Sequence, residues 1–184
     1  MRGIKMIVTL DEFNTYSGNM ENSESVAAMK ESMLMASQEV VSDYLGYSVE
    51  SKQYDDYLSP IGQPVLYLNA YPVSRILNLS LCGSDIPASD YTIGGRGIRL
   101  NSGVWPTGID TVYCSYVAGW SASDVPENVK MTILQIASLM LEESGGNIGI
   151  TGKTMAENSR TFVNYTNYDK WLKKLDPLRI VRLV

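Results

Sequence analysis

Histidine is absent from all 184 residues of this chain. Its imidazole is the commonest general base near neutral pH and the commonest metal ligand in proteins. The sequence also has no Ser-His-Asp set, no cysteine pair at metal-binding spacing, no P-loop and no dinucleotide-binding fingerprint. The adjacent carboxylate pairs Asp55-Asp56 and Glu142-Glu143 fit a solvated face and a helix end. We therefore expect no catalytic residues, no metal and no cofactor.

Cysteine is scarce too, with Cys82 and Cys114 each lying in strand-like alternation. Buried free thiols explain such positions better than a disulfide or a redox role. No stretch approaches the roughly 18 apolar residues of a membrane-spanning helix. The first ten residues lack the apolar core of a secretory signal. We expect a cytoplasmic protein with no membrane partner.

Basic residues are in the minority, with 15 Lys and Arg against 20 Asp and Glu, a net charge of -5. Tight binding to nucleic acid comes from clustered cations that neutralise phosphates, so this balance argues against it. It does not argue against DNA passing nearby. The hydrophobic share of 45% is that of an ordinary globular protein. We expect one core domain over residues 1–146, followed over 147–184 by a polar loop, a short helix and a C-terminal arm.

Two helices are predicted at the start of the chain. Thr9 and Glu12 form a capping-box pattern for a short helix that Gly18 ends. A long helix follows over 23–44, and its apolar series repeats at three and four residues: Val26, Met29, Met33, Ala36 and Val40, with Leu34, Val41 and Leu45 widening the stripe. Lys30 falls on the other, polar face. The methionine stripe suits either a core or an adaptable binding surface, and the core is favoured.

The stretch from Asp110 to Gly146 organises the fold. A strand over 110–117 leads to a helix for which Asp124 is the candidate N-cap, Pro126 lies in the first turn and Gly145-Gly146 forms the end. This helix is apolar on most of its circumference, so it needs cover on more than one side. Either the rest of a small domain or a neighbouring subunit provides that cover.

The middle of the chain has the period of strands. Candidates run over 49–58, 64–68, 72–82, 91–93 and 98–100, and in the third Leu77, Leu79 and Leu81 are expected on one face. The glycine-rich run 94–97 lies between two strands, which favours a hairpin turn over a phosphate cradle. With the strand at 110–117 we expect an α+β fold in which the late helix packs on a mainly antiparallel, hairpin-rich sheet of about five strands.

The end of the chain changes composition again. Residues 147–158 are polar and predict a mobile loop, and 161–165 could extend as a strand. A short helix over 167–175 carries Lys170, Lys173 and Lys174 opposite its apolar side. The tail from Leu178 to Val184 is apolar with two arginines. The candidate partner interface is Trp171, Leu175, Leu178, Arg179, Ile180 and Val181.

Several local sequences recur in an order typical of one family. They are Val8-Thr9-Leu10-Asp11-Glu12-Phe13, residues 37–41 with Tyr44-Leu45-Gly46, Tyr71-Pro72-Val73, Tyr91-Thr92-Ile93, residues 112–120, residues 125–130 and Lys174-Leu175-Asp176-Pro177-Leu178-Arg179. The most specific part is the strand, aromatic-Ala-Gly-aromatic, Pro-Glu and helix succession. Taken together they resemble the head-tail connector (adaptor, or head completion) proteins of long-tailed bacteriophages and prophages. The middle, 47–108, is longer than in short members.

The resemblance implies a ring, usually of about twelve copies, that docks under the portal protein in the host cytoplasm during assembly. In the virion neck it would extend the DNA channel toward a tail or stopper protein. Such a ring contacts DNA only transiently, and Arg96, Arg99 and Lys153 are candidate channel-facing residues. Two other classes stay open. The 12 tyrosines suit a carbohydrate- or peptide-binding module, and a carboxylate-dependent phage enzyme would need two carboxylates converging in a cleft.

Overall fold

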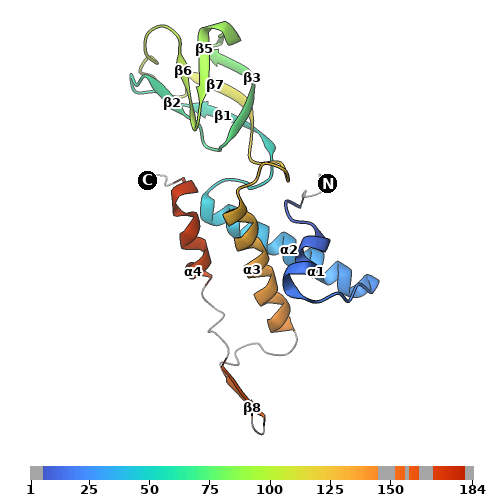
Figure 1. The fold of residues 1–184 in the computed structure, drawn as a ribbon. Helices are drawn as coiled ribbons and strands as arrows, with labels where there is room; N and C mark the ends of the chain where they lie inside the picture. The colour runs from blue at the N-terminus through green and yellow to red at the C-terminus, as the bar shows by residue number, and fades with distance from the viewer. Residues whose placement is uncertain (1–5, 145–151, 156–157, 162–167, 181–184) are drawn as a thin grey trace. The chain divides into compact units, whose positions relative to one another are not determined.

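The chain forms an α+β fold with antiparallel sheets, which confirms the expected class. A computed structural model describes residues 6–144 and 168–180, with the backbone of 152–155 and 158–161. The chain divides into two compact units (Figure 1). The helical unit joins Met1–Leu45 to Asp124–Arg179, and the β unit comprises Gly46–Ser123 with Ile180–Val184. Whether residues 1–146 fold as one domain stays a prediction.

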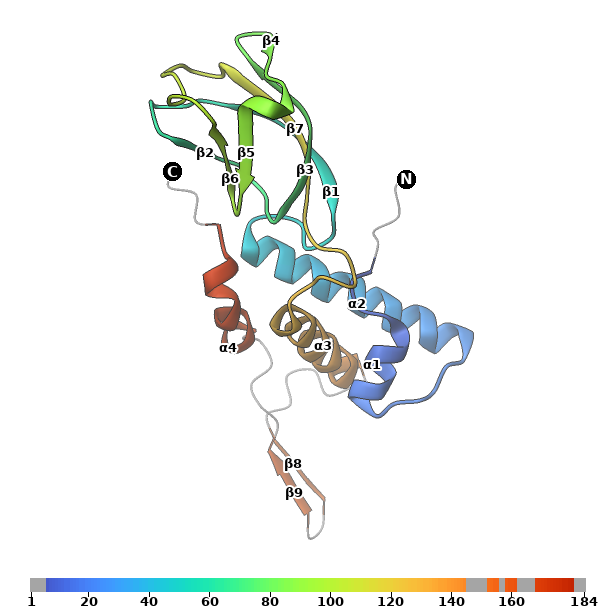
Figure 2. The same cartoon turned by 45° about the horizontal axis from the view of Figure 1, so that its top comes forward.

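The helical unit has α3 between α1 and α4, with the long α2 running across them (Figure 2). Its elements are α1 Leu10–Ser17, α2 Glu24–Leu45, α3 Glu127–Glu142, α4 Asp169–Leu172 and the 3-10 helix η3 Lys173–Leu178. Among the described residues, no helix is both long and apolar enough to cross a bilayer.

The predicted capping box of α1 is confirmed. The Glu12 N–H donates to Thr9 Oγ1 at 3.2 Å, and the Thr9 N–H donates to Glu12 Oε2 at 2.8 Å. The latter bond is the main reason why the pKa of Glu12 lies below its usual value. Gly18 then ends the helix in the left-handed conformation, at φ 69°. A purely local pattern thus fixes both ends of α1.

The long helix α2 buries only one edge of the predicted apolar stripe. Its buried residues are Lys30, Leu34, Ser37, Gln38, Val41 and Leu45. The methionine stripe lies about 100° around the helix from this face, with Met29 and Ala36 exposed and Met33 half-buried. The prediction that the methionine line is core is therefore wrong, whereas Leu34, Val41 and Leu45, which widen the stripe, are buried as expected. Lys30 enters the core because its ammonium group finds acceptors there, as described below.

The late helix α3 is the core of the helical unit. Val129, Ile133, Ile136 and Ala137 are at most 1% exposed, and α3 contacts α1, α2, α4 and η3. Within the helical unit its cover comes from other helices, and its packing on the sheet stays a prediction. Its N-cap residue is Pro126 rather than Asp124, and the expected glycine end at 145–146 lies outside the described residues.

The β unit contains two sheets rather than the single sheet of about five strands that we expected. One has the order β1-β7-β3-β4 and the other β2-β6-β5. The strands are β1 Lys52–Leu58, β2 Val65–Tyr67, β3 Val73–Leu81, β4 Ser84–Asp85, β5 Tyr91–Gly94, β6 Gly97–Leu100 and β7 Val112–Ala118, with a 3-10 helix η1 Ala88–Asp90. The core side chains come from both sheets and the segment before β7: Ile98, Trp105, Cys114 and Tyr116 are fully buried.

Strand β3 departs from simple alternation. Its pairing with β7 shifts register between Ile76 and Asn78. The shift turns Leu77 outward, where it is 44% exposed, while Leu79 is 2% exposed. The expectation that both leucines share one face is therefore wrong. Cys82, expected to be buried, is exposed just after β3.

Two hairpins complete the described structure. β5 and β6 pair in register from Tyr91↔Leu100 to Gly94↔Gly97, which confirms the hairpin expected at the glycine run. β8 Gly152–Met155 pairs with β9 Asn158–Thr161. The expected loop over 147–158 therefore contains a strand, and most of the strand expected over 161–165 lies outside the described residues.

Candidate interaction surfaces

A buried lysine organises the turn between α1 and α2. The Lys30 side chain is fully buried, and its Nζ donates to Asn14 Oδ1 at 2.7 Å, to the Asn19 carbonyl at 2.8 Å and to the Glu21 carbonyl at 2.7 Å. Asn14 Nδ2 in turn donates to Asn22 Oδ1 at 2.9 Å. One ammonium group thus fixes the loop over 18–23 from inside. The sequence interpretation missed it, and the signal available was that Lys30 lies at helical spacing from Leu34, Val41 and Leu45.

The loop that Lys30 holds presents acidic and apolar side chains to solvent. Asp11, Glu21 and Glu24 are exposed, and beside them Met20 is 66% and Tyr16 41% exposed. Lys30 is the only basic residue of α2, so no exposed cation lies on that helix. We call this region, from α1 to the first turn of α2, the acidic end of the helical unit.

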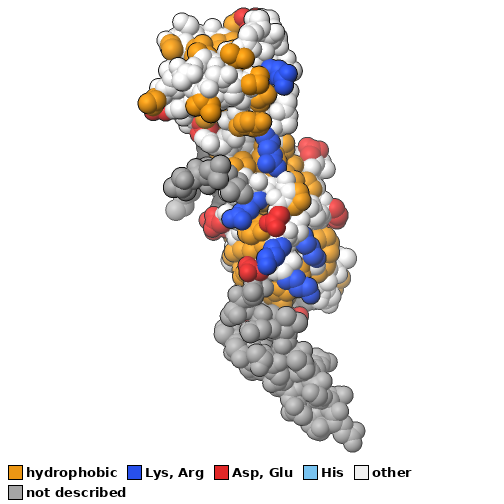
Figure 3. Space-filling view, turned by 90° about the vertical axis from the view of Figure 1, so that its left-hand side faces the viewer, with side chains coloured by type: hydrophobic (Ala, Val, Ile, Leu, Met, Phe, Trp, Pro, Cys, Tyr) orange, Lys and Arg blue, Asp and Glu red, His pale blue; other side chains and the backbone are white. Residues whose placement is uncertain are grey.

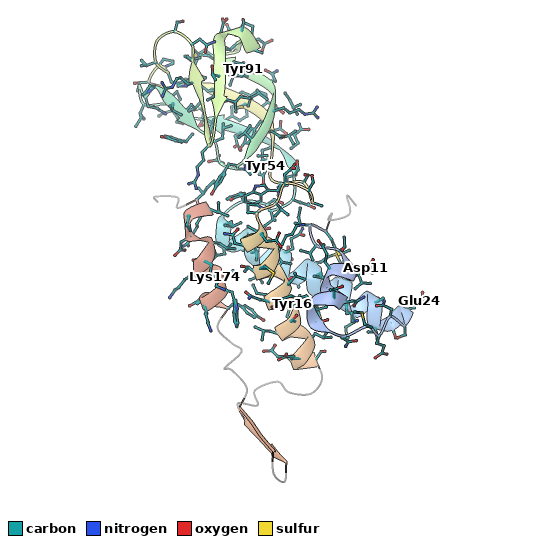
Figure 4. The ribbon with its side chains drawn as sticks, in the orientation of Figure 1. Asp11, Tyr16, Glu24, Tyr54, Tyr91 and Lys174 are labelled. Carbon is teal, nitrogen blue, oxygen red and sulfur yellow. The ribbon has the colours of Figure 1, made fainter. Side chains whose placement is uncertain are left out.

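The opposite side of the same unit is basic. Four cations are exposed there: Lys170 on α4, Lys173 and Lys174 on η3, and Arg179 just after η3. Figure 3 views this side of the helical unit, where blue side chains gather among orange ones with some red ones between them. In Figure 4, Lys174 lies on one side of the unit and Asp11 and Glu24 on the other, with Tyr16 between them. We call the four cations the basic face.

The candidate partner residues of the C-terminal segment occupy different environments. Leu175 is fully buried in the helical unit, so it supports the chain's own core. Trp171, Leu178 and Ile180 are half-buried. The exposed Arg179 places its guanidinium 4.9 Å from the centre of the Tyr44 ring. Val181 lies outside the described residues. That these residues meet a partner stays a prediction.

A pocket of about 750 Å³ opens between α1, α3 and α4. It is lined by Tyr16, Ser17, Asn19, Gln135, Ser138, Leu139, Leu141, Glu142 and Trp171. In the described part of the chain, Gln135 Oε1 and Ser138 Oγ are buried without a hydrogen-bond partner. Buried polar atoms ordinarily have partners, so this pocket is suited to a group that supplies hydrogen bonds.

The three candidate channel residues are in different settings. Arg96 donates from Nη2 to the Tyr71 hydroxyl at 2.7 Å, and its guanidinium lies 4.1 Å from the centre of the same ring. Arg99 is exposed beside a pocket of about 190 Å³. Both belong to the β unit, whereas Lys153 belongs to the helical unit, in the β8–β9 hairpin. That they face a channel stays a prediction.

One face of the four-stranded sheet carries an aromatic and polar network. Tyr57 is 68% exposed, and its ring centre is 5.1 Å from that of Tyr113. The Tyr113 hydroxyl donates to Asp55 Oδ1 at 3.1 Å, and Gln53 Nε2 donates to Ser115 Oγ at 3.1 Å. The hydrogen bond from Ser115 is the main cause that lowers the pKa of Asp55. The hydrogen bond to Asp55 is the main cause that raises the pKa of Tyr113.

Asp56 points to the other face of the sheet. It accepts a hydrogen bond from the buried Tyr116 hydroxyl at 2.7 Å and another from Asn69 Nδ2 at 3.1 Å. Burial, followed by this hydrogen bond, raises the pKa of Tyr116. Asp55 and Asp56 therefore do not converge in one cleft, as a pair of glycosidase carboxylates would. Among the described residues, no cluster of His, Cys, Asp and Glu could hold a metal ion.

The chain shares its fold with chains of solved particle structures. Over 97% of this chain and 92% of the other, a chain of "Virion of native gene transfer agent (GTA) particle" aligns with a TM-score of 0.61 at 15% identity. A chain of "Neck of empty GTA particle computed with C6 symmetry" aligns with the same coverage, a TM-score of 0.59 and 14% identity. A chain of "Neck of native GTA particle computed with C12 symmetry" aligns over 95% and 90%, with a TM-score of 0.57 and 14% identity. No protein-family model matches the sequence, and no curated protein does.

Proposed function

We propose that this protein is a non-enzymatic connector of a phage-like particle, which forms a ring in the neck between the portal protein and the tail or stopper protein. The observation that carries the proposal is the fold shared over nearly the whole chain with chains of neck structures computed with C6 and C12 symmetry. A ring of identical copies needs a surface that meets a different surface on the next copy. The helical unit has two chemically different sides of this kind.

The charge of the chain suits passage of DNA without capture. With a net charge of -5, the chain as a whole does not attract phosphates, and Arg96 is already engaged by Tyr71. We expect weak binding of duplex DNA by the free protein at physiological salt. Tight binding in a mobility-shift assay with a steep salt dependence would contradict this part of the proposal.

The test is deletion of the gene in the host that produces the particles. We expect DNA-filled heads without tails, a neck that lacks this chain, and recovery when the full-length chain is supplied from a plasmid. In purified wild-type particles, mass spectrometry should detect the chain, and images of the neck should show it in a closed ring. Normal tailed particles from the deletion strain would overturn the proposal.

The C-terminal arm is proposed to meet the portal protein or an adjacent copy. The short helix already packs on its own unit through Leu172 and Leu175, so removal of residues 178–184 leaves that anchor in place. We expect the truncated chain to keep its melting temperature but to fail in completing connector-deficient heads. A large loss of stability in the isolated protein would show instead that the tail belongs to its own core.

A second candidate is a carbohydrate- or peptide-binding module, which the exposed Tyr57 beside Tyr113 and Asp55 favours. Aromatic faces flanked by polar groups bind sugars through stacking and hydrogen bonds. A glycan array with the wild-type chain and a Tyr57→Ala variant examines it. Binding that the substitution abolishes would support a carbohydrate-binding module, and an array without signal would remove carbohydrate as its ligand.

A further inference from the structure

We infer that neighbouring copies contact each other through the basic face of one copy, on α4 and η3, and the acidic end of the next, at α1 and the first turn of α2. This inference rests on the proposed function, because it names the surfaces by which the ring closes. The occupant of the basic face is thus a second copy of the same chain.

Charge complementarity is the first support. The basic face carries the exposed Lys170, Lys173, Lys174 and Arg179, which outnumber the exposed Asp169 and Asp176 beside them. The acidic end carries the exposed Glu21 and Glu24. Opposite charges steer the approach of two surfaces, and like charges set against each other cost several kcal/mol. Contacts between two acidic ends, or between two basic faces, are therefore disfavoured. Charge thus disfavours a two-fold dimer that pairs like surfaces and favours the contact between unlike surfaces.

The position of the two surfaces is the second support. They lie on opposite sides of the same unit (Figure 4), so one copy can use both at once. A head-to-tail contact repeated in this way generates a ring when the rotation closes. The chains of similar fold occur in necks computed with C6 and C12 symmetry, which is the arrangement that such a contact requires.

The third support does not depend on attraction between the two surfaces. It is the order that the buried Lys30 gives to the loop of the acidic end. A fully buried ammonium group with three acceptors holds the loop that exposes Met20 and Glu21. Burying a charge is costly, and the fold uses it here to order an exposed turn. A loop that is ordered before binding loses less entropy on association. The exposed Met20 has an apolar counterpart in the half-buried Trp171 of the basic face.

Chemical cross-linking of purified particles tests the contact. A carbodiimide joins ammonium and carboxylate groups that touch, without adding a spacer. We expect a product of twice the chain mass in which a peptide with Lys170, Lys173 or Lys174 is joined to the peptide with Glu21 and Glu24. Particles grown in heavy nitrogen and particles grown in light nitrogen are mixed before cross-linking. A link that forms within one particle joins only peptides of the same isotope.

Charge exchange provides the genetic arm of the test. The triple variant Lys170→Glu, Lys173→Glu, Lys174→Glu and the double variant Glu21→Lys, Glu24→Lys should each lower the yield of tailed particles by about a hundredfold or more. A chain carrying all five substitutions should recover to within about tenfold of wild type, because the attraction is restored with its sign reversed. Asp85→Lys, an exposed reversal in the β unit, is the control and should leave the yield unchanged. Melting temperatures show that each variant folds.

The outcomes separate this inference from the proposed function. If the chain is present in the neck but its lysines link elsewhere, for example to another protein of the particle, the contact is wrong and the connector function stands. Failure of the five-substitution chain to recover, when it folds normally, also overturns the contact. If the chain is absent from purified particles, the proposed function fails and the contact fails with it.

Discussion

Replacing Lys30 by methionine should destabilise the helical unit markedly. Methionine keeps most of the unbranched stem, so the substitution removes the ammonium group with little loss of packing volume. Three carbonyl or amide oxygens, on Asn14, Asn19 and Glu21, then lose a donor at 2.7 to 2.8 Å. Hydrogen bonds to charged groups contribute about 1.5 to 3 kcal/mol each. Removing the buried charge returns its desolvation cost, which offsets part of this loss.

The net loss should be about 3 kcal/mol, within the range measured when one partner of a buried charged network is removed. Urea unfolding followed by far-UV circular dichroism measures it. With an m-value of about 2 kcal/mol per molar, the midpoint should fall by about 1.5 M. The m-value itself should stay the same, because the surface exposed on unfolding hardly changes.

The matched control is Lys130→Met. Lys130 Nζ lies 3.5 Å from Glu12 Oε1, and the two side chains are 20% and 43% exposed. A surface pair of this kind contributes about 0 to 1 kcal/mol. If Lys30→Met costs no more than this control, the buried ammonium group does not hold the turn. The loop of the acidic end would then not be ordered by Lys30 before a neighbouring copy binds.

Two further predictions concern the β unit. The exposed Cys82 should react with iodoacetamide at mildly alkaline pH, while Cys114 stays unmodified until the protein unfolds. The reason is that burial raises the pKa of the Cys114 thiol to about 12. Equal labelling rates of the two cysteines in a peptide-mass assay would refute this. Gly119→Ala should lower stability by about 3 kcal/mol or prevent folding, since φ is 107° and an added Cβ would lie 2.3 Å from the Glu50 carbonyl oxygen. Gly95→Ala, with open space around it and φ 53°, should cost about 1 kcal/mol, and similar melting temperatures for the two variants would contradict the difference.

The features that could be predicted from the sequence are those set by neighbours along the chain. The capping box of Thr9 and Glu12 closes within one helical turn, so four consecutive residues contain all the information it needs. The hairpin over 91–100 follows from glycines between two short strands. The late helix is recognisable because the spacing of Val129, Ile133 and Ile136 repeats with the helical period.

The features that could not be predicted depend on partners distant in the sequence. Periodicity assigns every lysine to the polar face, whereas burial of Lys30 requires acceptors on Asn14 and in the loop before α2. With Lys30 inward, the buried face of α2 centres on Leu34 and Val41, and Met29 is exposed. A shift of register in β3 likewise turns Leu77 to solvent. The placement of the lysines and the acids on opposite sides of the helical unit could not be predicted for the same reason, because the two groups lie more than a hundred positions apart in the sequence.

The division of the helical unit into Met1–Leu45 and Asp124–Arg179 makes Gly46–Ser123, the main part of the β unit, an insertion. The two ends of that insertion are tied together. Ser51 N–H donates to the Trp120 carbonyl and Trp120 N–H to the Val49 carbonyl, each at 3.0 Å. An insertion whose two ends lie side by side can be replaced without moving the segments that flank it. A chimera that replaces residues 51–119 with a two-residue turn should keep the helical scaffold intact, and sheets of other lengths or surface chemistries could be grafted at the same joint.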